Sequence, residues 1–125
     1  MDDEAARRLV ERQARSWETN DFELGAGDWA PDGVLKAPGV TVPFERLGGE
    51  MAHFHELYVD LRVDIKNVFT SRDGNRIALE WDWEVSRRSD GARSTTNDAI
   101  VVDLVDDKIA SWREYFDPAQ GVEGP

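Results

Sequence analysis

The histidines are the first side chains whose type and spacing could support chemistry. His53 and His55 are the only two in the chain, and both lie in a predicted helix. Being two residues apart, they point in different directions and cannot form the i, i+4 pair that binds a metal ion on a helix. We therefore expect at most one of them to enter a cavity. His53 is the candidate catalytic residue, because it lies on the same side of the predicted helix as Leu57; a surface position is the alternative for both.

Two tryptophans, Trp81 and Trp83, lie one residue apart in the most regular alternation of the chain. Over residues 77–85 apolar side chains alternate with polar ones, which predicts a strand with one covered face. Both indoles lie on that face, where they offer a large apolar area and N–H donors. They either pack under a helix as core residues or form the wall of a pocket. The alternation leaves both interpretations open.

Composition and missing motifs exclude several classes of function. The chain has no cysteine, which excludes disulfides, thiolate chemistry and cysteine-bound metals. It has no glycine-rich phosphate loop, no Gly-x-Ser-x-Gly motif and no histidine-rich metal spacing. The formal net charge is −11, from 26 acidic and 15 basic residues, so nucleic acids and anionic membranes would be repelled. We expect no cofactor and no metal, and small neutral or cationic ligands remain open.

The length of 125 residues predicts a single domain with one core, spanning residues 1–125. The charged N-terminus lacks the apolar run of a signal peptide, and no segment approaches the length needed to cross a bilayer. A cytoplasmic protein is therefore expected. From about residue 117 to 125 the composition is that of a loose tail.

Three helical segments are predicted. Residues 3–19 place apolar side chains at three- and four-residue steps, which is typical of an amphipathic helix. Residues 21–33 are interpreted as a short, glycine-interrupted helical segment, with Phe22 and Trp29 as its apolar contacts and a Pro-Asp-Gly turn at its end. Residues 45–60 predict a third helix, weakened by a Gly-Gly pair.

Strands make up most of the rest of the chain. Turn sequences rich in aspartate and glycine separate alternating segments, as expected for antiparallel hairpins. Helices followed by a meander of long strands require the sheet to fold around the helices, which gives an α+β cone with a cavity inside. The strands are predicted over residues 34–37, 61–71, 77–86, 94–105 and 109–116.

The order of these elements, together with the sequences WAPDGVLKAP and KIASWREYFD, resembles the SnoaL-like branch of the nuclear transport factor 2-like superfamily. That superfamily includes polyketide cyclases, ketosteroid isomerases and limonene-epoxide hydrolase. The resemblance implies a cone-shaped α+β barrel, in which N-terminal helices pack into a strongly curved antiparallel sheet that encloses a pocket.

The resemblance to limonene-epoxide hydrolase extends without a gap from the tryptophan strand to the last strand. In that enzyme an Arg-x-Asp pair, an acid on the last strand, a Tyr and an Asn hold and activate the water. The matching positions here are Trp81 and Trp83 for the Arg and Asp, Glu114 for the acid, and Leu35 and Ala37 for the Tyr and Asn. Because only one of the five polar roles is retained, epoxide hydrolysis by that route is not expected.

The resemblance also implies which side chains face the pocket. It places both tryptophans on the pocket wall rather than beneath a helix, and it orients two further strands by their register. Such a wall suits an apolar or aromatic small molecule. The implied binding residues are Leu35, Ala37, Trp81, Trp83, Thr96, Trp112 and Phe116.

Asp98 and Glu114 share this implied face and form a candidate catalytic carboxylate pair. Two acids in an apolar cavity push their pKa values apart, so that one stays ionised as a base and the other keeps a proton as a donor. The cyclases and isomerases of the superfamily use an Asp with a second acidic or histidine donor in this way. Alternatively, Asp98 is a capping residue or pairs with an arginine at the rim, and Glu114 bonds a backbone or indole N–H.

The opposite face of the predicted sheet is charged. Alternating acids and bases there would form a solvated surface, or would pair across the two-fold axis of a homodimer, which the superfamily commonly forms through this face. The charged residues concerned are Glu80, Asp82, Glu84, Arg87, Arg88 and Arg113.

Two classes of function follow. One is a cofactor-free acid–base enzyme, an isomerase, cyclase or lyase, acting on a hydrophobic or aromatic carbonyl compound. The other is a non-catalytic protein that binds an apolar small molecule, or serves only as a dimerising module. The two differ in whether Asp98 and Glu114 can both reach one ligand in one cavity.

Overall fold

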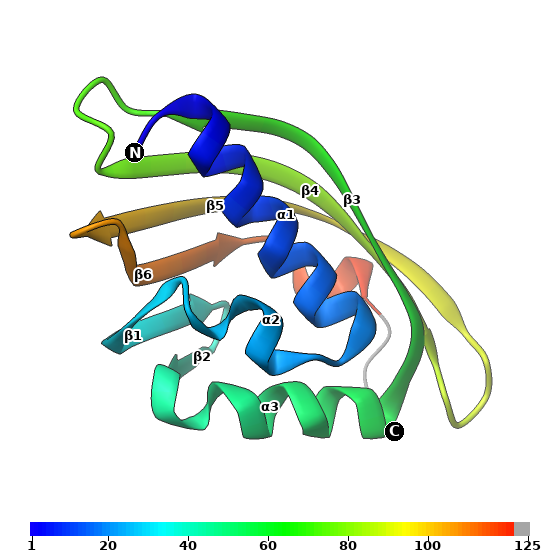
Figure 1. Ribbon diagram of the computed structural model, residues 1–125. Coiled ribbons are helices and arrows are strands. Elements are labelled where there is room, and N and C mark those ends of the chain that lie inside the picture. Colours follow the sequence, from blue (N-terminus) through cyan, green and yellow to red (C-terminus); the bar gives the residue numbers. More distant parts are fainter. Residues whose placement is uncertain (122–125) are drawn as a thin grey trace.

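A curved sheet wraps around the helices of this chain (Figure 1). The computed structural model describes residues 1–121. Its six strands form one sheet, in the order β2-β1-β6-β5-β4-β3. The helices are α1 (Asp3–Thr19), α2 (Phe22–Ala26), α3 (Phe44–Leu57) and the short 3-10 helix η1 (Pro118–Gln120). The strands are β1 (Trp29–Ala37), β2 (Val40–Pro43), β3 (Tyr58–Thr70), β4 (Arg76–Arg87), β5 (Arg93–Val105) and β6 (Lys108–Tyr115).

Helix α1 has the bounds that its periodicity predicts. It begins where the Asp2 side chain accepts a hydrogen bond of 2.8 Å from the backbone N–H of Ala5, and it ends at Asn20 in the left-handed conformation. Its apolar side, which includes Leu9 and Val10, is fully buried against the sheet. None of the helices within residues 1–121 is long and apolar enough to span a bilayer.

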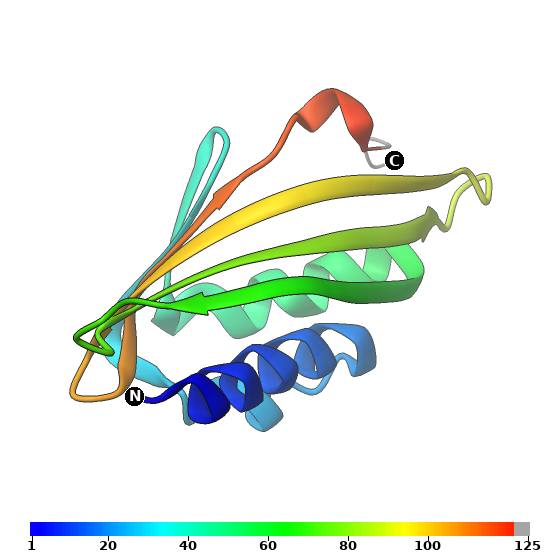
Figure 2. The same ribbon diagram turned by 90° about the horizontal axis from the view of Figure 1, so that it is seen from above.

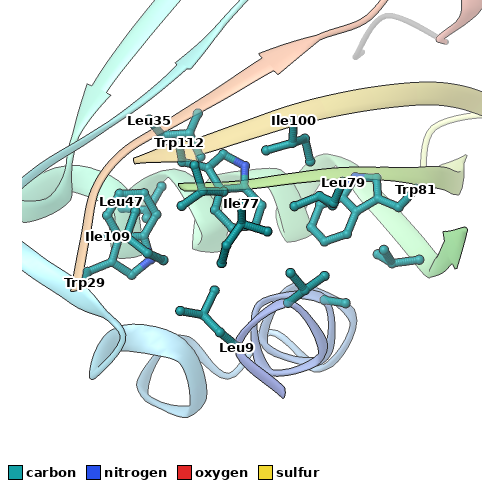
Figure 3. Packing of buried hydrophobic residues seen from close by; sticks show 14 of the residues in the cluster. Leu9, Trp29, Leu35, Leu47, Ile77, Leu79, Trp81, Ile100, Ile109 and Trp112 are labelled. Carbon is teal, nitrogen blue, oxygen red and sulfur yellow. The ribbon is translucent and has the colours of Figure 1, made fainter. Parts of the chain in front are cut away.

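Strand β4 buries the apolar face that its alternating sequence predicts. Ile77, Leu79 and Trp81 are buried on the inner face, and Ala78 and Glu80 are exposed on the outer face. The inner side chains meet Leu9 of α1 beneath the sheet (Figure 3). Viewed from above, the long strands bend over the helices (Figure 2), so the sheet is curled but not closed.

The expected helical segment over residues 21–33 is wrong beyond Ala26, because Trp29 begins strand β1. The Trp29 indole Nε1–H donates to Gln13 Oε1 on α1 (3.1 Å), and Gln13 Nε2 donates to the Gly25 carbonyl oxygen (2.9 Å). This buried amide satisfies the polar groups of two neighbouring elements, so Trp29 can be buried without an orphaned donor.

Strand β1 also makes the sheet mixed rather than entirely antiparallel. It pairs in parallel with β6, with a register shift between Trp29 and Val34. Gly33 lies within this irregularity, where a Cβ atom would come within 2.7 Å of the Ile109 carbonyl oxygen. Strand β2, which pairs antiparallel with β1, was not predicted.

The expected loose tail is in part a structured cover for the edge of the sheet. Strand β6 ends at Tyr115, opposite Ala99, so the first half of β5 lacks a partner on that side. The backbone N–H of Asn97 donates to Gln120 Oε1 (3.0 Å), and Gln120 Nε2 donates to Asn97 Oδ1 (3.0 Å). Residues 122–125 of the expected tail lie outside the described residues.

Candidate functional site

A pocket of about 440 Å³ lies between the inner face of the sheet and the helices. Its lining comes from α1, α3, all six strands and the segment that follows β6, and most of it is apolar. The long strands curve over the helices that line the other side of this space (Figure 2).

The pocket collects the side chains expected to bind a ligand. The inward positions of β4, β5 and β6 supply most of them, since every second residue of a strand faces the same side. Cross-strand pairing brings Trp83 opposite Thr96, and Leu35 opposite Trp112. The expected residues that line the pocket are Leu35, Ala37, Trp81, Trp83, Thr96, Trp112 and Phe116.

The two tryptophans of β4 occupy different environments. Trp81 is 2% exposed and belongs to the hydrophobic core, while one side of it also forms the pocket floor. Its ring lies 5.6 Å from that of Trp112 and 6.2 Å from that of Trp83. Trp83 is only partly buried and forms part of the wall. Trp81 therefore fits both interpretations of the sequence, whereas Trp83 fits the pocket wall.

Asp98 and Glu114 meet at this floor. Asp98 lies opposite Trp81 across β4 and β5, and Glu114 lies opposite Ile100, so the two acids are diagonal neighbours on adjacent strands. Both line the pocket, and their carboxyl groups are hydrogen-bonded to each other. Asp98 is 5% exposed, whereas Glu114 keeps part of its surface open to the cavity.

The pKa values of both acids are raised. Burial raises the pKa of Glu114 well above its ordinary value; the hydrogen bond and charge of Asp98 raise it further, and a hydrogen bond with Trp112 opposes this only in part. Burial also raises the pKa of Asp98, although hydrogen bonds with Glu114, Trp81 and the Tyr115 backbone oppose it. Because each carboxyl affects the pKa of the other, the two titrate as a coupled pair, and the pair keeps a proton above the pH at which a free carboxyl loses it.

Two buried polar atoms at this floor lack a partner of standard hydrogen-bond geometry. They are Trp81 Nε1 and Asp98 Oδ1. The indole is nevertheless close enough to lower the pKa of Asp98. Because neither atom is accessible, a ligand in the pocket would meet Glu114 before Asp98.

The expectation that His53 enters the cavity is wrong. Its side chain is 64% exposed and its Nδ1 lies 3.5 Å from Glu56 Oε2. Helix α3 faces the pocket with Leu47, Glu50 and Phe54, a three- and four-residue spacing that leaves His53 on the outer side. His55 lies 2.6 Å from the Trp17 carbonyl oxygen through its Nε2, outside this pocket.

Three aromatic residues of the pocket wall were not predicted. Trp17 comes from the end of α1, and Phe54 and Tyr58 come from the end of α3 and the start of β3. Trp17 lies on the predicted apolar side of its helix, and Phe54 follows Leu47 by seven residues, so helical phase was the available signal. The acid Glu50, one turn before Phe54, lines the pocket as well.

The pocket offers no cluster of metal ligands. Among residues 1–121, no three His, Cys, Asp or Glu side chains lie close enough together to hold a metal ion.

Residues 10–112 match the SnoaL-like domain family. No curated protein matches the sequence. A proposed polyketide cyclase from Pseudomonas putida KT2440 has a TM-score of 0.80 at 19% identity, with 93% of each chain covered. An LEH-like epoxide hydrolase from Mycobacterium tuberculosis has a TM-score of 0.77 at 19% identity, covering 93% of this chain and 85% of its own.

A third structural relative was solved with a small molecule. It is a hypothetical protein with a ketosteroid isomerase-like fold from Catenulispora acidiphila, in complex with trimethylamine. Its TM-score is 0.80 at 16% identity, with 90% of this chain and 87% of its own covered. At such identities these structures establish a shared α+β cone fold.

Proposed function

The chain belongs to the SnoaL-like domain family, and on that premise we propose that its pocket binds a small hydrophobic or aromatic carbonyl compound and acts on it by acid–base catalysis without a cofactor. The observation that carries this proposal is the Asp98–Glu114 contact at the floor of an apolar cavity. Within residues 1–121 no lysine or arginine lines the pocket beside these two carboxyls, and their burial is unfavourable for stability, which favours a functional reason for their presence.

The chemistry assigns different roles to the two acids. Glu114 is the candidate catalytic residue, because it faces the cavity and can touch a ligand. When ionised, it takes a proton from the carbon next to the carbonyl, which leaves an enolate, and it returns that proton to another carbon of the enolate, as in an isomerisation. Asp98 is a positioning residue, which orients Glu114 and raises its pKa.

The structural relatives support a small-molecule pocket of this kind. A proposed polyketide cyclase shares the fold, and the relative with trimethylamine supports occupation of this fold by a small organic molecule. Limonene-epoxide hydrolase chemistry is not proposed, since the resemblance places Trp81 and Trp83 at the positions of its Arg and Asp.

A non-catalytic binding protein is the second candidate. It is favoured by the burial of Asp98, which leaves Glu114 as the one acid of the pair with surface open to the cavity. In that case the pair would only anchor a ligand, and no bond of the ligand would change.

The test is hydrogen–deuterium exchange next to a carbonyl. A panel of hydrophobic and aromatic ketones is incubated with the protein in D2O, and exchange is followed by NMR. We expect exchange above the buffer rate for at least one ketone, and Glu114→Gln should reduce it by about 10²- to 10⁴-fold.

Controls separate catalysis from folding. Glu80→Gln makes the same change on the outer face of β4 and should leave the rate unchanged. Asp98→Asn should lower the pH at which the rate rises, because it removes a neighbour that raises the pKa of Glu114. Unchanged exchange in Glu114→Gln would contradict the catalytic role, and binding without exchange in the native chain would favour the second candidate.

A further inference from the structure

We propose that the ligand of this pocket carries a positively charged nitrogen, which is bound by cation–π interactions at an aromatic end of the pocket. The aromatic end consists of Trp17, Phe54, Tyr58 and Trp83. The inference rests on the proposed function to the extent that a small molecule must occupy this pocket, and it names a property of that molecule.

The rings of the aromatic end form one contiguous surface. Trp83 lies 5.6 Å from Trp17 and 5.4 Å from Phe54 between ring centroids, and Trp17 lies 5.8 Å from Phe54. These three contacts are edge-on, with interplanar angles of 67°, 68° and 85°. In an edge-on contact one ring presents its edge to the face of the other, so each contact covers only one electron-rich face. Tyr58 stacks on Phe54 at 4.9 Å and 23°, which covers one face of each of these two rings.

The charges of the pocket all have one sign. Three acidic side chains line it, Glu50, Asp98 and Glu114, and no lysine, arginine or histidine does so within residues 1–121. Glu50 lies one turn before Phe54 on α3, so this exposed acid and the aromatic end lie on the same side of the helix. No ion pair within the described residues neutralises it.

The buried carboxyl adds an independent observation. Asp98 Oδ1, in a residue that is 5% exposed, has no hydrogen-bond partner of standard geometry. Because Asp98 Oδ1 is not accessible from the cavity, it adds negative charge beneath the floor rather than a contact for the ligand, and no lysine, arginine or histidine within residues 1–121 lines the pocket to balance that charge. Such a site opposes an anionic ligand and is completed by a cationic one.

A neutral aromatic ligand is the simpler alternative, since the rings would also bind it through apolar contact. The charge of the ligand distinguishes a cationic ligand from a neutral aromatic one. A cation over an aromatic face gains about 0.5–2 kcal/mol that a neutral group of equal shape does not. The nearby carboxylates add to that difference, whereas apolar area contributes equally to both ligands.

The test compares two probes of nearly the same shape, phenyltrimethylammonium and tert-butylbenzene. Affinities are measured on the full chain by tryptophan fluorescence, with calorimetry as a second readout, at neutral pH and low salt. We expect phenyltrimethylammonium to bind about 3- to 30-fold more tightly. Benzoate, as an anionic probe, should bind more weakly than either.

Variants locate the effect at the aromatic end. Trp83→Leu keeps apolar volume but removes an aromatic face, so it should reduce the preference for the cation and retain most of the affinity for tert-butylbenzene. Glu50→Gln should weaken binding of the cation by about 1.4- to 5-fold. Glu45→Gln is its matched control, since Glu45 is exposed on the same helix and lies outside the pocket lining.

Two results would overturn the inference: equal or tighter binding of tert-butylbenzene, and no measurable binding of phenyltrimethylammonium. A cation preference that persists undiminished in both Trp83→Leu and Glu50→Gln would overturn the placement at the aromatic end. These outcomes are independent of the exchange assay, in which a failure of Glu114→Gln to reduce the rate tests only the proposed catalysis.

Discussion

Asp98 and Asp103 lie on the same strand, β5, but on opposite faces of the sheet. Asp103 on the outer face accepts hydrogen bonds from Arg76 Nε (2.7 Å), Ser111 Oγ (2.7 Å) and Arg113. Asp98 on the inner face has a second acid, Glu114, and an indole as its neighbours. Within residues 1–121, one strand thus holds a carboxylate bonded to two arginines and a carboxyl that forms no ion pair.

The pKa values of the two aspartates are shifted in opposite directions. Partial burial would raise the pKa of Asp103, but hydrogen bonds from Ser111, Arg113 and Arg76 outweigh it and lower the pKa. Burial raises the pKa of Asp98, and its hydrogen bonds do not reverse the shift. Carboxyls on the outer face therefore contribute to folding, while those on the inner face oppose it when ionised.

The largest expected effect on stability comes from the replacement of aspartate by asparagine, made separately at Asp98 and at Asp103. Asp103→Asn should lower the free energy of unfolding by about 1–3 kcal/mol, because it leaves two arginines without their carboxylate. Asp98→Asn should leave it unchanged or raise it, since a buried charge is removed. Urea unfolding at pH 7 measures both, with the exposed Asp32→Asn as control. Equal destabilisation by Asp98→Asn and Asp103→Asn would remove the distinction between the two faces.

A second prediction concerns pH. The pKa of Glu114 is raised in the folded chain, so its protonated form stabilises the fold fully below the ordinary carboxyl pKa. This contribution is lost as pH rises from the ordinary carboxyl pKa through the raised pKa of the folded chain. Over that range Glu114 has already released its proton in the unfolded chain but still holds it in the folded chain. Glu114→Gln should flatten that decline and be more stable than the native chain near pH 7. Unfolding midpoints measured from pH 4 to 8 would show the difference, and parallel curves would contradict it.

The smallest expected effect concerns the outer face. We expect a homodimer at micromolar concentration that weakens as salt rises, with each exposed ion pair contributing under about 1 kcal/mol. Several of the expected charges already pair within the chain, as Glu84 does with Arg93 and Arg87 with Asp90. Phe69 and Tyr115, which are 58% and 59% exposed on this face, would add a contact that salt does not weaken. Light scattering that shows a monomer at every salt concentration would refute the dimer.

Local patterns predicted the parts of the fold that repeat regularly. The alternation around Trp81 gave the strand and its inner face, and the spacing of Leu9 and Val10 gave the buried side of α1. The positions of Trp83 and Glu114 at the pocket followed from strand phase combined with the family resemblance. In each case a periodic pattern extends over several residues, so one side of the element is specified many times over.

The errors lie where distant contacts decide the structure. Trp29 belongs to a strand because Gln13 and β6 hold it there, and nothing in the glycine-rich sequence around it indicates those partners. The pairing of β1 with β6 joins opposite ends of the chain, and no local signal gives its direction. His53 was placed by proximity to Leu57, although the phase of Leu47 and Phe54 is the one that faces the pocket.

The insertion of β6 between β1 and β5 also has a consequence for the order of folding. Leu35 of β1 pairs with Trp112 of β6. Leu35 is made early in synthesis and Trp112 late. The β1–β2 hairpin cannot join the sheet until β6 has been made, so the long antiparallel strands can pair before the wall of the pocket is complete. Closing such a long loop is slow because its entropy is lost before the contact is gained. Binding capability should therefore appear in the last kinetic phase of refolding, after most of the secondary structure has formed.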